Sequence, residues 1–427
     1  MGFLEERVER LGKRVQKMKA HPDPRKAVSN VLFYEAELEK EKAQIVARDE
    51  GRPFALTADM WSPLTKAMGF STYAPSHAAD RIVPEKLQYY TDEANKLEIP
   101  DYYCDRMVLC VPLILREGGL PLPKVILSSD VGCELHGLAF SLIGHLGDIP
   151  FFHIYYPFEY DYKPYLGYIT GQLQEFIAFA EEKVPGVKYD ENKLRDLLGV
   201  LPEWFALNNQ IFELRKTVPC PDHPQDVFRE VQYPCGYPNP QKILDYMRAY
   251  RDELSAKVER GYSPVKEERL RLMWTTTGPH NNKVWDLLLE RGVPVPYVMF
   301  GLSARYYGVG YPGVGDTTEF GRKLSPLEEV ARPRLGNSFG GTAKMWIDQA
   351  LRACRECKID AIINFDQVGC TPVTGYSRLL KDAAEREMGI PSLNIVGREK
   401  MWTKQDEEQF LDQVDNFITR CLKRKGF

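Results

Sequence analysis

The chain has 427 residues, of which 44% are hydrophobic and 27% charged, and its formal net charge is -4. This length predicts two or three domains with a sizeable core, and the composition is that of an ordinary globular protein. The charge excludes the strongly basic character of a nucleic-acid-binding protein. No apolar run approaches the roughly 20 residues that span a bilayer, and the N-terminus lacks the apolar core of a signal peptide. We therefore expect a cytoplasmic protein with no nucleic-acid partner and no membrane contact.

The first half of the chain predicts helices followed by an alternation of strands and helices. Gly51 and Pro53 end the initial helical pattern. The β–α–β order that follows is typical of a parallel sheet. We expect helices over 3–20, 27–49 and 77–97, in MWSPLTKAMGF, from near Cys104 and after Cys133, and strands in GRPFALTA and over 124–128 and 150–156.

A second alternation follows a helical stretch that covers most of 163–262. It begins with the strand RLMWTTT, the helix NKVWDLLLERG and the strand VPVPYVMFG. The predicted fold class is α/β, with two doubly wound parallel-sheet domains, an N-terminal helical segment and a helical connector. Later elements are helices at 341–356, 374–388 and 404–423 and strands at 359–365 and 391–396. The predicted division is 1–50, 51–162, 163–264 and 265–427.

Two stretches share one pattern: KVILSSDVGCELHG and NFDQVGCTPVTG each place an aspartate, then Val-Gly-Cys, between a strand and a helix. Ligands of parallel sheets bind beyond the carboxyl ends of the strands, and the first amides of a helix stabilise thiolates and cluster sulfides. Two facing domains would bring Cys133 and Cys370 into one cleft, with Cys104 as a third member. Three thiolates would leave one iron of a four-iron cluster open to water or substrate. Buried, inert thiols are the alternative.

Several segments resemble one known family. DYYC at 101–104, SSDVGC at 128–133 and IDAIINFDQVGC at 359–370 followed by MGIPSLNIVGRE are similar to the three cysteine segments of the benzoyl-CoA reductase and 2-hydroxyacyl-CoA dehydratase family. GRPFALTADMWSPLTKAMGF resembles its N-terminal segment, and RLMWTTTGPHNNKVWDLLLERG its mid-chain strand and helix. The resemblance extends from about residue 50 to residue 420.

The resemblance implies a [4Fe-4S] cluster, held by Cys104, Cys133 and Cys370, in the cleft between the domains. It implies a related smaller iron–sulfur subunit as partner, and a separate ATP-hydrolysing activator, itself an iron–sulfur protein, as electron donor. The implied substrate is a CoA thioester, reduced or dehydrated through a radical. The chain length suits the larger subunit, in whose site the substrate lies. The absence of GxxxxGK[ST] agrees with ATP hydrolysis on another chain.

Other polar residues near these segments are candidates for proton transfer or anion binding. Glu134 and His136 follow Cys133, where they would handle a proton or serve as a helix cap and an exposed histidine. His280, in TTTGPHNN before a helix, would help to hold a CoA phosphate or the thioester, or lie in a simple capping segment. The glycine-rich GVGYPG at 308–313 lacks the strand-to-helix context of a dinucleotide site and is interpreted as a loop over the cleft.

The remaining cysteines have plainer interpretations. Cys110 could replace Cys104 as a ligand if the predicted helix start near Cys104 were wrong, but Cys104 is preferred because the family places the ligand before the helix. Cys354 and Cys357 form a CxxC inside a helix and are interpreted as ordinary thiols, or as extra ligands in a double-cubane relative. Cys220, His223 and Cys235 make an incomplete zinc set in a proline-rich loop.

The aromatic run FFHIYYPFEYDYKPY at 151–165 favours an aryl pocket, and with it a benzoyl-CoA reductase, over a 2-hydroxyacyl-CoA dehydratase. A double-cubane reductase is a third alternative. Two others belong to different classes: a non-catalytic electron-relay subunit and a cluster-free interaction module.

Overall fold

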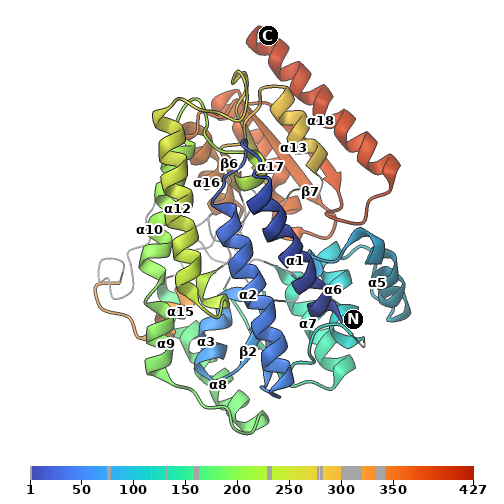
Figure 1. Cartoon of the computed structure of the whole chain (residues 1–427), viewed down its shortest axis with the longest axis vertical. Coiled ribbons are helices and arrows are strands. Elements are labelled where there is room, and N and C mark those ends of the chain that lie inside the picture. Colours follow the sequence, from blue (N-terminus) through green and yellow to red (C-terminus); the bar gives the residue numbers. More distant parts are fainter. Residues whose placement is uncertain are drawn as a thin grey trace.

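The computed structural model places two parallel sheets at opposite ends of an elongated molecule (Figure 1). It describes residues 2–74, 78–116, 118–130, 133–157, 163–227, 233–276, 278, 282–299, 320–332 and 342–427. Helix α18 (Lys404–Lys425) projects at the C-terminal end, beside the second sheet.

Both sheets have four strands in the same order. Sheet A runs β2-β1-β3-β4 and sheet B runs β6-β5-β7-β8, and every described pair is parallel. The prediction of two parallel-sheet units is therefore confirmed. The strands are β1 (Phe54–Thr57), β2 (Ser71–Tyr73), β3 (Val125–Ser129), β4 (Phe151–Ile154), β5 (Leu272–Thr275), β6 (Tyr297–Met299), β7 (Ala361–Gln367) and β8 (Ser392–Gly397).

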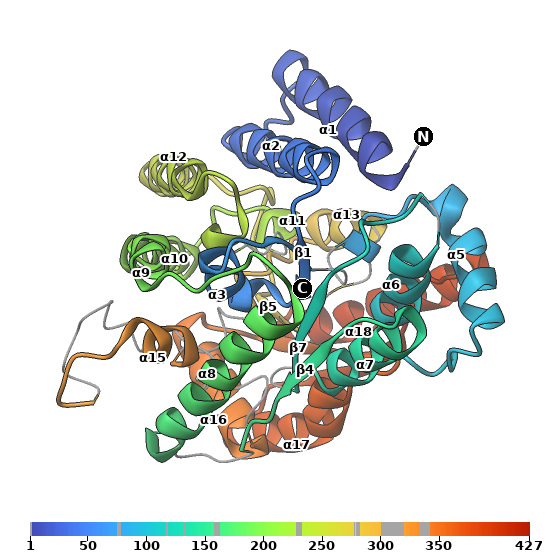
Figure 2. The same ribbon diagram turned by 90° about the horizontal axis from the view of Figure 1, so that it is seen from below.

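Sheet A is buried on both faces, which explains its continuous apolar strands. Leu127 packs in the core on one face and Ile126 in the core on the other. Figure 2 shows the two groups of helices on either side of this sheet. One face carries α5 (Pro84–Lys96), α6 (Asp105–Leu115) and α7 (Glu134–Gly147), and the other carries α2 (Asn30–Asp49), α3 (Ser62–Ala67), α8 (Leu166–Lys183), α10 (Leu201–Arg215) and α12 (Pro240–Glu259).

Sheet B is covered in the same way. Ile362 faces a core that includes α16 (Ala343–Glu356) and α17 (Thr371–Met388). Ile363 faces the opposite core, with α13 (Asn282–Glu290) and α18. The N-terminal α1 (Phe3–Ala20) packs on α2 and contributes Phe3 and Leu4 to the core of sheet A.

Several predicted boundaries are wrong, among them the start of α2 at Asn30 instead of residue 27, and one strand was missed. Residues 77–97 do not form one helix: the structure describes this stretch from residue 78, and α5 begins only at Pro84 after Val83 with an extended ψ of 150°, because a residue before proline avoids the helical region. The three-residue β2 was not predicted, since it is too short to show a period. Helix α17 begins at Thr371, three residues before the predicted start, and this places its first turn directly after Cys370.

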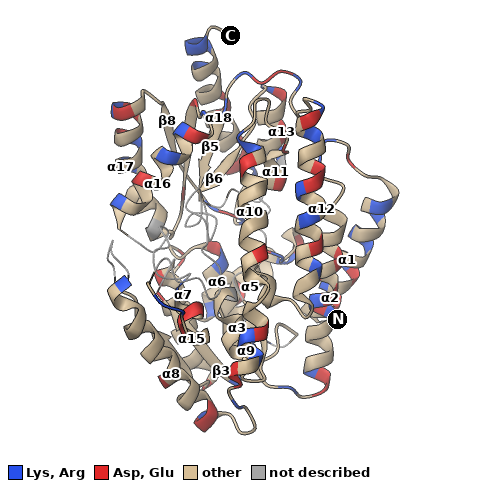
Figure 3. Cartoon of the chain, turned by 90° about the vertical axis from the view of Figure 1, so that its left-hand side faces the viewer, with Lys and Arg blue, Asp and Glu red and all other residues tan. Residues whose placement is uncertain are grey.

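Charged side chains of both signs are scattered over the helices in the view of Figure 3, in keeping with the small net charge. None of the described helices is both long enough and apolar enough to cross a membrane.

Candidate functional site

The three cysteines singled out from the sequence occupy equivalent places at helix N-termini. Cys104 directly precedes α6, Cys133 precedes α7 and Cys370 precedes α17. Backbone N–H groups in the first turn of each helix interact with the sulfur atom and favour its thiolate. The start of α6 right after Cys104 is the geometry predicted when Cys104 was preferred to Cys110.

Gly369 joins the two halves of the molecule by direct backbone contact. Its φ of +78° is in the left-handed region, and a Cβ atom placed on it would lie 2.4 Å from the backbone N of Cys104 and 2.8 Å from the carbonyl O of Tyr102. No side chain fits there without displacing main chain, so this turn admits only glycine. The contact brings Cys370, the next residue, against the segment that carries Cys104.

A hydrogen bond joins the other two helix starts. Thr371 Oγ1, at the first position of α17, donates to Glu134 Oε2, at the first position of α7, over 3.0 Å. Cys133 and Cys370 each precede one of these two residues. The three cysteines therefore converge on one region, where the carboxyl ends of β3 and β7 face each other.

Burial dominates the electrostatics of the three thiols. It raises the pKa of Cys104, Cys133 and Cys370, the last to about 12, and nearby thiols raise the pKa of Cys104 and Cys370 further. A hydrogen bond from Thr276 opposes this effect on the pKa of Cys370. Burial thus disfavours the three thiolates, and a cation bound between them would offset this effect.

Ion pairs tie sheet B to the start of α6 beside this region. Arg106 donates from Nε and Nη2 to the two carboxylate oxygens of Glu399, at 2.8 and 2.6 Å, and also pairs with Asp80 at 2.7 Å. Asp105 accepts backbone N–H groups from Lys400 and Met401 at 2.7 and 2.9 Å. The turn after β8 is thus bound to Asp105 and Arg106, the two residues that follow Cys104.

Glu134 and His136, which were predicted to handle a proton, lie on the first turn of α7 beside Cys133. Glu134 is exposed and held by Thr371. His136 is half-buried, and its ring stacks on Phe140 with centroids 5.2 Å apart. His280 lies outside the described residues, as does the loop at 308–313.

Several polar groups at these strand ends were not predicted as site residues. Asp130 follows β3, and burial raises its pKa, while its Oδ1 accepts the N–H of Tyr156 at 3.1 Å. Asp366, near the end of β7, has its pKa raised to about 6 by burial. Both belong to the repeated Asp…Val-Gly-Cys pattern, and this repetition could have identified them as site residues from the sequence. The hydroxyls of Thr276 and Thr371 carried no such signal.

The other cysteines near the core are buried thiols. Cys110 is inaccessible, and its Sγ donates to the carbonyl O of Met107. Cys354 and Cys357 lie in the core between sheet B and α16, with Cys354 Sγ 3.9 Å from Met273 Sδ. The nine cysteines all lie within the described ranges, and none of them forms a disulfide bond.

The zinc set considered for the proline-rich loop is not assembled. Cys235 donates to the carbonyl O of Leu197 in the core of sheet A, whereas Cys220 lies near Arg271 and Glu268. Within the described parts of the chain, no three His, Cys, Asp or Glu side chains are grouped so as to hold a single metal ion. In a four-iron cluster each cysteine binds a different iron, so its ligands surround the cube and do not meet at one ion.

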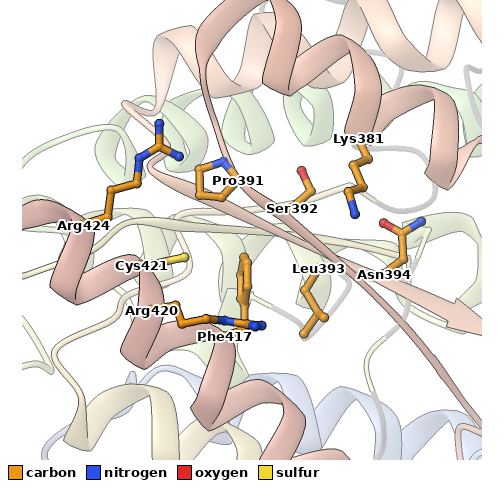
Figure 4. A pocket seen from close by; sticks show the side chains of 9 residues that line it. All are labelled: Lys381, Pro391, Ser392, Leu393, Asn394, Phe417, Arg420, Cys421 and Arg424. Carbon is orange, nitrogen blue, oxygen red and sulfur yellow. The ribbon is translucent and has the colours of Figure 1, made fainter.

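A separate pocket of about 430 Å³ lies at the amino end of β8, between α17 and α18 (Figure 4). It lies away from the strand ends that carry the cysteines, because Ser392 begins β8 whereas the turn beside Cys104 follows its end. Its lining residues are Lys381, Pro391, Ser392, Leu393, Asn394, Phe417, Arg420, Cys421 and Arg424.

Comparison with known proteins identifies the family. The family model described as "2-hydroxyglutaryl-CoA dehydratase, D-component" matches residues 64–419. The chain belongs to this family. The expected resemblance to benzoyl-CoA reductases and 2-hydroxyacyl-CoA dehydratases is thereby confirmed.

Two curated relatives are members of multi-subunit enzymes. A benzoyl-CoA reductase subunit of Thauera aromatica is 22% identical over 293 residues, which cover 65% of this chain and 65% of the relative. The alpha subunit of (R)-2-hydroxyglutaryl-CoA dehydratase of Acidaminococcus fermentans is 21% identical over 289 residues, 66% of this chain and 57% of the relative. The match thus spans less than two thirds of either relative's length.

Proposed function

We propose that this chain is the iron–sulfur subunit of a benzoyl-CoA reductase-type enzyme and that Cys104, Cys133 and Cys370 hold a [4Fe-4S] cluster. The observation that carries the proposal is the meeting of three cysteine-headed helices from both halves of the molecule, through the Gly369–Cys104 contact. Three sulfur donors facing helix amides are the soft ligand set that iron–sulfur clusters use. Such a cluster would supply low-potential electrons to an aromatic acyl-CoA thioester.

The residues of this chain would orient and protonate the substrate. Thr371 Oγ1 donates to Glu134 Oε2, and this hydrogen bond holds the carboxyl group of Glu134 next to Cys133, where it is the first proposed proton carrier. His136 is the second proposed proton carrier. A related smaller iron–sulfur subunit is the first proposed partner, because the two curated relatives are named as subunits. An ATP-hydrolysing activator, which the resemblance of the cysteine segments implies, is the proposed electron donor. We place the assembly in the cytoplasm.

Loss of a 2-hydroxyl group as water is the second candidate reaction. The name of the matching family model favours it, whereas the aromatic residues of β4 and the segment after it favour an aryl substrate. Phe152 packs against Phe176 and Phe179, and Tyr155 is 61% exposed at the strand end. Assays of oxygen-free protein with benzoyl-CoA and with 2-hydroxyglutaryl-CoA, each with an activator, distinguish the two reactions.

The cluster itself is tested by replacing its proposed ligands. Protein purified without oxygen should contain about four iron and four acid-labile sulfide per chain. Cys133→Ser and Cys370→Ser should each lose most of both, together with the brown colour. Cys421→Ser, which removes a buried thiol at the far end of α18, is the matched control and should keep them. Unchanged iron in Cys133→Ser would refute the ligand assignment, and about eight iron per chain would return Cys354 and Cys357 as ligands of a double cubane.

A further inference from the structure

Positive charge gathers around the pocket between α17 and α18 without any carboxylate among the lining residues. Lys381 comes from α17, and Arg420 and Arg424, one turn apart, come from α18. In Figure 4 Ser392 lies between Lys381 and Arg424, and Arg420 lies beside Phe417. Two helices therefore direct three cations at one short stretch of β8.

These three cations have no ion-pair partner in the described parts of the chain, unlike their neighbours. Arg378, one turn before Lys381, pairs with Asp382 at 2.8 Å. Lys425, next to Arg424, pairs with Asp360 at 2.7 Å. Besides burial, the charge of Asp360 raises the pKa of the nearby Cys421 thiol, and its carboxylate also accepts the backbone N–H of Arg271. The carboxylates of Asp382 and Asp360 are thus already paired.

The pocket also contains unused hydrogen-bonding groups. The hydroxyl of Ser392 is buried and has no hydrogen-bond partner among the described residues. β8 is an edge strand that pairs only with β7 in the described sheet. The carbonyl O of Pro391 accepts from Ile362 N–H, so the next residue, Ser392, turns its amide to the open edge. A buried hydroxyl without a partner is destabilising, and an oxygen atom of a ligand would provide the missing hydrogen bond.

We propose that this pocket binds a small molecule that carries a phosphate group. Arginine side chains hold phosphate oxygens in pairs, and lysine adds a point charge. Phe417, Leu393 and Pro391 provide an apolar surface for the organic part of the ligand. The volume of about 430 Å³ accommodates a phosphate ester of the size of a nucleotide. The site is separate from the proposed cluster and does not depend on its presence.

Isothermal titration calorimetry of the full chain with ADP, inorganic phosphate and adenosine tests the proposal. ADP should bind and adenosine should not. Arg420→Ala and Arg424→Ala should each raise the Kd for ADP roughly tenfold, since a charge-assisted hydrogen bond is lost. Lys423→Ala removes a charge from the same helix outside the pocket and should leave the Kd unchanged.

The phosphate probe separates two sources of affinity. Equal Kd values for inorganic phosphate and ADP would mean that only the phosphate group of the ligand is bound, by the three cations. Tighter binding of ADP would mean that the apolar surface also contributes to the affinity. The proposal is overturned if neither probe binds at about 10 mM, a concentration that reveals even weak sites. It is also overturned if ADP binds equally well to the wild type, Arg420→Ala and Arg424→Ala, because the ligand would then lie elsewhere.

Discussion

Gly369 is the residue on which the relation between the two halves depends most directly. Its positive φ and its contact with the Cys104 backbone exclude any side chain. The sequence showed a glycine before each strand-end cysteine and so predicted a tight turn. It did not reveal that this turn touches residues 102–104, because that contact joins segments more than 260 residues apart in the chain.

Replacing Gly369 by alanine should destabilise the protein more than the same change at an open position. Gly389 has a similar φ of +66° with no atom within 4 Å of its Cβ position, so Gly389→Ala should cost about 1 kcal/mol through backbone strain alone. Gly369→Ala adds the overlap with main chain, for a total above roughly 2 kcal/mol. Urea unfolding measures both. Equal costs would mean that the contact with Cys104 is not close in solution.

His223 should make stability depend on pH. Burial lowers its pKa from 6.5 to about 4, against the opposing charge of Asp226, and its Nε2 has no hydrogen-bond partner in the described chain. As the pH falls, the unfolded state therefore binds the proton first. The free energy of unfolding is highest above pH 6.5 and decreases as the pH falls from 6.5 through 4. The shift corresponds to up to about 3 kcal/mol.

His223→Asn should remove most of that dependence, and urea unfolding between pH 4 and pH 7 measures it. His21→Asn, at an exposed histidine, serves as the control. A pH profile unchanged by His223→Asn would contradict the prediction.

The turn after β8 and the start of α6 form the main polar clamp between elements of the two halves. Arg106 has only 14% of its side chain exposed and Glu399 none. Breaking a buried pair leaves one charge unpaired, which costs about 3 to 5 kcal/mol. We therefore expect Glu399→Gln to destabilise the protein by at least about 3 kcal/mol in urea unfolding.

The exposed pair Arg291–Asp415, also bound through two nitrogens, is the matched comparison. Asp415→Asn should change stability by less than about 1 kcal/mol. A similar small effect of Glu399→Gln would show that water reaches the clamp.

Corresponding helices of the two halves suggest why the proposed cluster has three protein ligands. Cys133 and Cys370 follow β3 and β7, the third strands of their sheets. The helices that precede these strands are α6, with Cys104 at its N-cap, and α16, with Thr342 at its N-cap. The buried Thr342 hydroxyl has no hydrogen-bond partner in the described chain. Thr342 is thus the residue of the second half that corresponds to Cys104, and it carries a hydroxyl in place of a thiol.

On the proposed function, Thr342→Cys should supply a fourth thiolate. The electron paramagnetic resonance spectrum of the reduced protein should change, and added cyanide should no longer shift it, since no iron remains open. Thr403→Cys, at the N-cap of α18, is the control and should behave as the wild type. A spectrum of Thr342→Cys identical to that of the wild type would reject the correspondence.

The sequence predicted most elements because their apolar patterns are local. It missed β2, which has three residues, and the start of α5, where a proline interrupts an otherwise helical pattern. The clamp at Asp105 and Glu399 could not be predicted, because its partners come from separate halves. For the same reason the sequence yielded the three cysteines as candidates but not the threonine and aspartate side chains around them.

At the scale of the whole molecule, two sheets of the same strand order share one site. Because the proposed ligands come from both halves, iron binding should stabilise the folded protein as a unit. Removing iron with a chelator in the absence of oxygen should lower the thermal midpoint, by roughly 1 °C per kcal/mol of lost stabilisation for a chain of this size. Differential scanning calorimetry measures it. An unchanged midpoint would place the iron outside the interface.

The Asp105 clamp has a consequence for the maturation of the protein. The residue after Cys104 is bound to the turn beyond β8, and the residue before Cys370 rests on the Cys104 backbone. On the proposed function, a preformed cluster would reach the buried Cys104 only before these two contacts form. Insertion would then come while the newly synthesised chain is still open, and replacing a damaged cluster would require the halves to separate again.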